Sequence, residues 1–295
     1  MKKRRRTLFV ASFLAPAALL YSLFVLWPLA QAFWLSLFRW RGVSVKKTWL
    51  GIENFRNLLQ DHAFLTSLKN GLWILIVCGL AIIVVSVLLA HASQGESRTA
   101  RGLRAVFLFP QVISLVVVAI LWKFIYNPEY GPVTGALRSV GAESFAKPWL
   151  ADNSTALICV GITFIWWASG FYIMLFAAGI KSLPTDVLEA AELDGARGLW
   201  KFFKVTWPML WSVKRVAYVY IVINVLNIFT LVYLMTQGGP DRRTEVPLTY
   251  LYEQAFKNNE FGYATAIAVT CFVLARATSG ILMLAMRRNP EGART

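Results

Sequence analysis

The chain contains few charged side chains, and acidic residues are especially scarce. Charged residues make up 15% of its 295 positions and hydrophobic residues 57%, and Asp and Glu together number 15. In soluble domains, about a quarter of the residues are charged. The apolar residues also come in uncharged runs long enough to cross a bilayer, for which about 18 residues suffice. The composition therefore predicts a membrane protein and disfavours a large soluble domain.

The residues of common catalytic and metal sites are also largely missing. Two histidines and three cysteines are present, and no HExxH, GxSxG or GxxxxGK[ST] sequence occurs. Cys78, Cys159 and Cys271 fall in separate apolar runs, without metal-ligand or redox spacing. Because the phosphate-binding sequence is missing, we do not expect this chain to hydrolyse ATP itself. A membrane-embedded enzyme is a weak alternative, since no paired carboxylates or histidine cluster lie at a common depth.

Basic residues, in contrast, are abundant. Lys and Arg number 30, which gives a formal net charge of +15. In a soluble chain this balance would favour nucleic-acid binding. Here the basic residues cluster beside the apolar runs, where they fix orientation and meet anionic lipid head groups. We therefore expect contact with membrane lipid and none with nucleic acid.

Six apolar segments predict six transmembrane helices in a single domain, residues 1–295. The segments cover approximately residues 8–38, 68–91, 105–126, 155–181, 212–236 and 261–286. Lys and Arg are more frequent in the segments that would face the cytoplasm if the amino terminus lies there. The predicted fold is thus an all-α membrane protein with both termini in the cytoplasm.

Charged residues at two of these spans need an explanation. Lys214 and Arg215 lie where the fifth span begins, and side chains of this length can snorkel to the inner surface. Arg276 lies inside the sixth span, where a charge is costly. Three roles remain open for Arg276: lining a translocation path, pairing with a partner subunit, or reaching the inner membrane interface.

The loop between the fourth and fifth spans, residues 182–208, carries the most specific pattern. Pro184 and the acidic residues after it suit the start of a helix, and two alanines favour its continuation. Gly195 is expected to end this helix in a left-handed conformation. A second short helix with an apolar face is predicted by the helical spacing of Trp200, Phe203 and Trp207.

The same loop resembles the EAA loop of the permeases of binding-protein-dependent ABC importers. It matches the pattern E-A-A-x-x-D-G-A-x5-F-x5-P without a gap. The positions that carry the match include Glu189, Ala190, Ala191, Asp194, Gly195, Phe202 and Pro208. A second stretch, from Met235 to Ala266, resembles the outer loop of carbohydrate-type permeases, in particular the maltose, lactose and glycerol-3-phosphate permease subunits.

This resemblance implies a type I ABC importer permease fold in a bacterial inner membrane. It implies a non-catalytic subunit that forms part of the translocation path for a sugar or sugar-like solute. In that family the EAA loop docks into a cleft of the ATP-hydrolysing subunit. The motif residues from Glu189 to Gly195 would form this docking knob, and Phe202 and Pro208 would fix the return to the fifth span.

The resemblance also implies three kinds of protein partner. These are an ABC ATPase dimer, a second homologous permease subunit, and a periplasmic or lipid-anchored solute-binding protein. ATP and Mg²⁺ would be bound by the ATPase, and no cofactor is expected on this chain.

Polar and aromatic residues within the spans are candidates for the substrate path. They are Tyr220, Asn224, Asn227 and Thr230 in the fifth span, Gln111 in the third and Trp166 in the fourth. In a sugar path, the amides would hydrogen-bond hydroxyl groups and the aromatic rings would stack on the apolar face of the solute. Buried amides in membranes usually form hydrogen bonds with neighbouring helices instead. Helix packing and solute binding are therefore both possible roles for these residues.

The main alternative is a secondary transporter or channel for small polar solutes. Such proteins typically show inverted repeats or charged coupling residues within several spans. No repeat is visible in this sequence, and Arg276 is the one candidate for a coupling charge.

Overall fold

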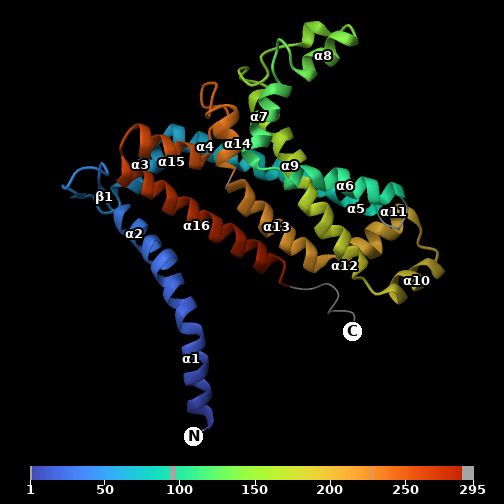
Figure 1. The fold of residues 1–295 in the computed structure, drawn as a ribbon, viewed down its shortest axis with the longest axis horizontal. Helices are drawn as coiled ribbons and strands as arrows, with labels where there is room; N and C mark the ends of the chain where they lie inside the picture. The colour runs from blue at the N-terminus through green and yellow to red at the C-terminus, as the bar shows by residue number, and fades with distance from the viewer. Residues whose placement is uncertain (1, 94–97, 227, 288–295) are drawn as a thin grey trace. The chain divides into compact units, whose positions relative to one another are not determined.

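The computed structural model describes residues 2–93, 98–226 and 228–287 and is mostly helical. It divides into two compact units, Met1–Asp61 with Leu251–Val273 and His62–Tyr250 with Leu274–Thr295. Figure 1 traces the chain and labels its elements. The chain begins with α1 (Lys2–Tyr21), the π-helical turn η1 (Ser22–Leu26), α2 (Trp27–Leu35), β1 (Phe38–Arg39), β2 (Thr48–Trp49) and α3 (Glu53–Gln60).

The first unit is organised around a short hairpin that follows α2. β1 and β2 pair antiparallel, with Phe38 opposite Trp49. The buried side-chain amide of Asn54, on α3, donates to the carbonyl oxygens of Ser36 and Phe38 at 2.8 and 3.0 Å. Gly262 approaches so closely that a Cβ atom there would lie 2.0 Å from the Phe38 oxygen. The hairpin therefore leaves no room for a side chain at Gly262.

The second unit contains the longer helices of the bundle. Its elements are α4 (His62–Trp73), η2 (Ile74–Cys78), α5 (Gly79–Ala92), α6 (Arg98–Val112), α7 (Leu115–Ile125), α8 (Pro132–Ser139), η3 (Glu143–Phe145) and α9 (Ala156–Lys181). These are followed by α10 (Thr185–Leu193), α11 (Gly198–Lys201), η4 (Phe202–Thr206), α12 (Trp207–Met209), α13 (Trp211–Leu226), α14 (Phe229–Met235) and the start of α15 (Pro247–Tyr252). The chain then returns to the first unit with the end of α15, η5 (Glu253–Lys257) and the first half of α16 (Phe261–Ala285), and the rest of α16, from Leu274, belongs to the second unit.

Helix α9 is the centre of the second unit. It packs most extensively against α5 and α6, and α7 packs against α14 (Figure 1). Three glycines bring the neighbours of α9 close. A Cβ atom would lie 2.9 Å from Cys78 Sγ at Gly161, 2.6 Å from the Phe107 oxygen at Gly170, and 2.7 Å from Val213 at Gly179. Small residues permit such close helix packing in membranes, where burial of apolar surface contributes little.

Four helices in the described part of the chain are long and apolar enough to cross a membrane. They are Phe9–Leu35, His62–Ala92, Ala156–Lys181 and Phe261–Ala285. Two bent pairs raise the number to six if each pair is one span: Val106–Val112 with Leu115–Ile125, and Phe202–Met209 with Trp211–Leu226. The segments predicted from hydropathy thus include helices that are broken in the structure.

The two breaks have local causes. In the first pair the helices meet at 113°, and Ser114 between them has extended backbone angles, with ψ 136°. In the second pair the angle is 70°, and Leu210 between the helices has φ −81° and ψ 21°, outside the α-helical range. Neither segment is therefore a straight rod, although its hydropathy is uniform.

The loop between α14 and α15 is fixed by a buried carboxylate. Glu245 is almost fully buried and pairs with Arg242 at 3.0 Å. Asn70, on α4, donates to the carbonyl oxygens of Arg242 and Glu245 at 3.1 and 2.9 Å. The Gly239–Pro240 peptide bond in this loop is cis. The loop that opens the stretch resembling the outer loop of sugar permeases, residues 236–246, is thus an ordered part of the second unit.

Candidate functional site

The loop after α9 forms the helix, turn and second helix that its sequence predicts. α10 ends at Leu193, and Gly195 has φ +84°. The backbone N–H of Gly195 donates to the Glu192 oxygen at 3.0 Å, and that of Ala196 to the Ala191 oxygen at 2.9 Å. This pair of bonds is a Schellman motif, in which the left-handed residue is usually glycine. Pro184 differs from expectation because it precedes the helix, with an extended ψ of 123°.

The motif residues on α10 are presented to the outside. Glu189, Ala190, Asp194 and Gly195 are exposed, and Ala191 is half-buried. Leu193, at the end of the helix, is 90% exposed and adds a large apolar side chain to this surface. The sequence motif did not indicate this residue. In Figure 1, α10 projects beyond the end of α9. The surface thus combines two carboxylates with small and apolar side chains.

The second half of the loop ties this surface to the bundle. Lys201 Nζ lies 2.6 Å from Glu192 Oε1, which links the second helix to α10. Phe202 is buried and contacts His91, with ring centroids 5.5 Å apart, and Trp207 at 6.2 Å. Pro208 is half-buried in the first turn of α12. Phe202 therefore anchors the return of the loop.

The aromatic side chains of this second helix differ in exposure. Trp200 and Phe203, which the sequence places on its apolar face, are 60% and 59% exposed, and Phe202 is the residue that packs inward. The segment contains a π-helical turn, η4, after the single turn of α11. Five-residue hydrogen bonding rotates the following side chains away from the α-helical periodicity that the prediction assumed.

Lys214 also differs from the expectation that it snorkels to the surface. Its exposed fraction is 6%. Its Nζ lies 4.5 Å from the centre of the Trp207 ring and 5.2 Å from that of Trp211. Arg215 is only half-buried and lines a cavity between α13 and the end of α16. Arg276 is exposed on α16, and its three possible roles stay open.

Several candidate path residues meet α9 within one turn. Asn224 Nδ2, on α13, donates to the Tyr172 hydroxyl at 3.1 Å. Tyr220 stacks on Phe171 with ring centroids 4.7 Å apart and stays 42% exposed. On α6, Gln111 Cβ would lie 3.3 Å from a Cβ atom at Gly170. We call Gln111, Tyr172, Tyr220 and Asn224 the α9 polar cluster.

The cluster mixes satisfied and unsatisfied polar groups. Gln111 Oε1 is buried and has no hydrogen-bond partner among the described residues. Close by, Trp167 Nε1 donates to the Ile113 oxygen at 3.3 Å, at the break between α6 and α7. Buried polar groups are rarely left unpaired. Gln111 therefore has an unused acceptor beside the broken helix.

Two other predicted path residues, Trp166 and Thr230, are not part of this cluster. Trp166 packs on Trp122 of α7 with ring centroids 5.5 Å apart. Thr230 is half-buried on α14. Asn227 lies outside the described residues. Phe171, which sequence reasoning missed, has no polar atom and shows its role only through its contact with Tyr220.

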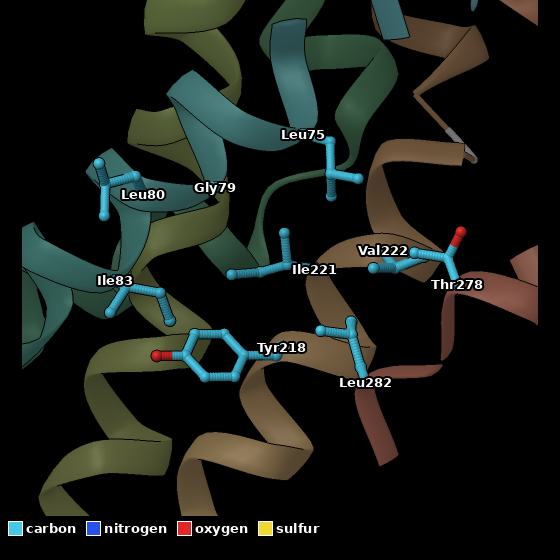
Figure 2. A pocket seen from close by; sticks show the side chains of 9 residues that line it. All are labelled: Leu75, Gly79, Leu80, Ile83, Tyr218, Ile221, Val222, Thr278 and Leu282. Atoms are coloured by element: carbon cyan, nitrogen blue, oxygen red, sulfur yellow. The ribbon is translucent and has the colours of Figure 1, made fainter. Parts of the chain in front are cut away.

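Two cavities flank α13. One, of about 420 Å³, is lined by Ser212, Arg215, Val216, Val219, Tyr220 and Met283. The other, of about 300 Å³, is lined mainly by apolar side chains of α5, α13 and α16, and its polar groups are the hydroxyls of Tyr218 and Thr278 (Figure 2). Tyr220, which is a candidate path residue, borders the first cavity.

Comparison with known proteins decides the family. Residues 82–288, which contain both the loop and the α9 polar cluster, match the model of the binding-protein-dependent transport system inner membrane component. The chain belongs to this family. It is therefore a transporter permease subunit and a multi-pass protein of the inner membrane.

Relatives cover almost all of this permease. It is 34% identical to the probable ABC transporter permease protein YurN of Bacillus subtilis, over 95% of this chain and 96% of that protein. It is 32% identical to the diacetylchitobiose uptake system permease protein NgcF of Streptomyces coelicolor, over 97% and 84% of the two chains.

A solved structure supports the fold of the permease. A chain of a bacterial ABC transporter involved in the import of the acidic polysaccharide alginate superposes with a TM-score of 0.82, covering 98% of both chains at 22% sequence identity. The fold is thus that of an ABC importer permease, as the loop resemblance implied.

Proposed function

We propose that this permease forms part of the translocation path for a sugar or sugar-like solute and couples to a separate ATPase through its loop at residues 182–208. The observation that carries the proposal is the exposed, Schellman-capped α10. Its motif residues face outward while Phe202 anchors the other end of the loop in the bundle. A projecting helix whose connecting loop is packed into the bundle is suited to docking against another chain.

The chemistry of α10 fits a partner with a basic, closely approaching surface. Carboxylates of Glu189 and Asp194 can pair with basic groups, and charge complementarity of this kind fixes register between proteins. Ala190 and Ala191 allow a close approach. Pro208 and Phe202 would hold the return to α13 during closure of the ATPase dimer, which would bind ATP and Mg²⁺.

The names of relatives favour a sugar-like solute. Relatives include the diacetylchitobiose permease NgcF, sn-glycerol-3-phosphate permeases called UgpA and the multiple sugar-binding transport permease MsmF of Streptococcus mutans. Amides and aromatic rings in the α9 polar cluster can bind hydroxyl groups and stack on sugar rings. We infer that Tyr220, Asn224 and Gln111 contact the solute, with Asn227, Thr230 and Trp166 as further candidates along the path.

Two more partners complete the proposed importer. One solved neighbour of the same fold is an alginate transporter in complex with an alginate pentasaccharide-bound periplasmic protein. By analogy we propose a solute-binding protein on the outer side, and a second permease subunit beside this one.

Reconstitution of the complete importer in lipid vesicles tests the proposal. Gly195→Pro should leave membrane insertion intact and abolish ATP hydrolysis stimulated by the loaded binding protein, because proline cannot adopt φ +84°. Thr185→Pro is the matched control, since the first residue of a helix accepts proline. The binding protein would first be screened against diacetylchitobiose, maltose and glycerol-3-phosphate.

Uptake of the identified solute without ATP would contradict the proposal and favour a secondary transporter. Unchanged stimulated hydrolysis in Gly195→Pro would instead contradict the role of the loop alone.

A further inference from the structure

The bend between the loop and α13 encloses a buried lysine that the proposed function does not use. Lys214 is 6% exposed, although lysine is almost never fully buried without a partner group. Its Nζ lies 4.5 Å from the ring centre of Trp207 and 5.2 Å from that of Trp211. Both distances are within the range of a cation–π contact, and indole is the best of the aromatic acceptors.

The two rings lie on opposite sides of the bend. Trp207 belongs to α12, before the 70° change in direction, and Trp211 is the first residue of α13, after it. Between them, Leu210 is fully buried. A single ammonium group therefore contacts one ring from each of the two helical segments, which resists a change in the angle between them.

Both tryptophans are themselves held by other parts of the second unit. The Trp207 ring lies 6.1 Å from Phe176 of α9 and 6.2 Å from Phe202 at the base of the loop. Trp211 Nε1 donates to the Met286 oxygen, just after α16, at 3.0 Å. The rings are thus fixed to the bundle and are not free to follow the lysine.

The same contacts join the loop to the candidate path. Lys201 and Glu192 connect α10 to the second helix, Phe202 connects that helix to Trp207, and Lys214 lies on α13 before Tyr220 and Asn224. A displacement of α10 that kept this angle fixed would move α13 as one body with the loop. If the angle between α12 and α13 could change freely, a displacement of α10 would bend the chain at Leu210 and would not move α13.

We propose that Lys214 is a positioning residue whose cation clamps Trp207 and Trp211 and so fixes the angle through which loop movement reaches α13. The inference rests on the proposed function for its role in coupling, but the clamp itself is a property of this chain. A neutral side chain of similar length would fill the space without restoring the attraction. Arg, which is cationic and stacks well on indole, would restore it.

Distance measurements between spin labels test the clamp without relying on transport. One label replaces Val187, which lies on α10 outside the motif, and the other replaces Ile223 on α13; both positions are exposed. In the reconstituted importer, the unsubstituted protein and Lys214→Arg should give one narrow distance distribution, and Lys214→Met a broader one. Lys204→Met, at an exposed lysine of the same loop, is the matched control and should stay narrow.

ATP hydrolysis by the same Lys214 and Lys204 variants without spin labels tests the coupling role. Lys214→Met should lower kcat about fivefold or more, with an unchanged KM for ATP, and Lys214→Arg should recover most of the loss. If Lys214→Met fails to insert, Trp207→Leu removes the same contact from the other side and should broaden the distance distribution in the same way.

An unchanged distribution in Lys214→Met would overturn the clamp, as would a Lys214→Arg variant as broad as Lys214→Met. A broadened distribution with normal ATP turnover would keep the clamp and overturn its role in coupling. Loss of hydrolysis in Lys204→Met as well as in Lys214→Met would overturn a specific role of Lys214 in coupling and leave the distance result unaffected. Uptake of the solute without ATP would contradict the proposed function and not the clamp.

Discussion

Gly195 is the residue on which the shape of the coupling loop depends most directly. Its φ of +84° places it in the left-handed region, and open space surrounds the position where a Cβ atom would be. A substitution there is therefore penalised by backbone strain and not by a collision. For a residue with a side chain the left-handed conformation costs about 1–2 kcal/mol.

We expect Gly195→Val to reduce coupled ATP hydrolysis about tenfold, since 1.4 kcal/mol corresponds to a factor of ten. The measurement is stimulated hydrolysis by the reconstituted importer. Gly280→Val is the control, because its site is equally open and its φ is not positive. Equal losses in the two variants would argue against a role for the turn.

Acid should weaken the link between α10 and the helix that follows it. The hydrogen bond from Lys201 holds the pKa of the Glu192 carboxyl below its ordinary value. Because the folded pKa is the lower one, this stabilisation is fully present above the ordinary glutamate pKa of about 4.3 and is lost as the pH falls through the folded value. The effect is modest, because Glu192 is largely exposed and water screens the pair.

Hydrogen exchange of the backbone amides of residues 196–201 measures this effect. Protection should be higher in the unsubstituted protein than in Glu192→Gln at pH 7, and the difference should disappear in strong acid. Glu189→Gln removes an exposed carboxylate of the same helix and serves as control. Equal protection at pH 7 in all three proteins would contradict the stabilising role of the pair.

At the scale of whole elements, α9 depends on its glycines for the close approach of its neighbours. Gly170 contacts the backbone oxygen of Phe107, which cannot move like the end of a flexible side chain. We expect Gly170→Ala to destabilise the protein by about 1–3 kcal/mol, the usual cost of overpacking. Thermal unfolding in detergent would show this as a lower midpoint, whereas Gly280→Ala, in open space, should change it little.

The broken helices are the elements in which hydropathy and structure differ. A run of apolar residues records only how much of a segment can lie in lipid. It does not record the extended backbone at Ser114 or the bend at Leu210. Both breaks lie where candidate functional residues gather, with Gln111 beside the first and Lys214 beside the second. Irregular backbone inside a membrane is tolerated where it is buried in protein or lines a cavity.

For the whole molecule, the direction of insertion is the property that most needs measurement. The predicted topology places both termini in the cytoplasm and the loop from 182 to 208 on the same side, which its proposed partner requires. Reporter fusions after Lys47 and after Lys204 should therefore report opposite sides of the membrane. Signals from the same side would contradict this topology, and a fusion after Arg287 should agree with that after Lys204.

The sequence by itself determined the features that depend on local composition. Long uncharged runs specify membrane helices because lipid excludes charge over a fixed thickness. Gly195 specifies a left-handed helix end because other residues resist that conformation, and the structure confirms it with a Schellman turn. The family followed from the same loop, since its pattern is contiguous in the chain.

Only the tertiary structure decided which side chains of that loop and of α13 face the protein. Phe202 is buried because its ring packs against His91 and Trp207, whereas Trp200 and Phe203 are exposed. Lys214 is buried between two indoles, and Asn224 bonds Tyr172, which lies 52 residues earlier in the chain. These outcomes depend on contacts between separate segments, and hydropathy and spacing describe one segment at a time.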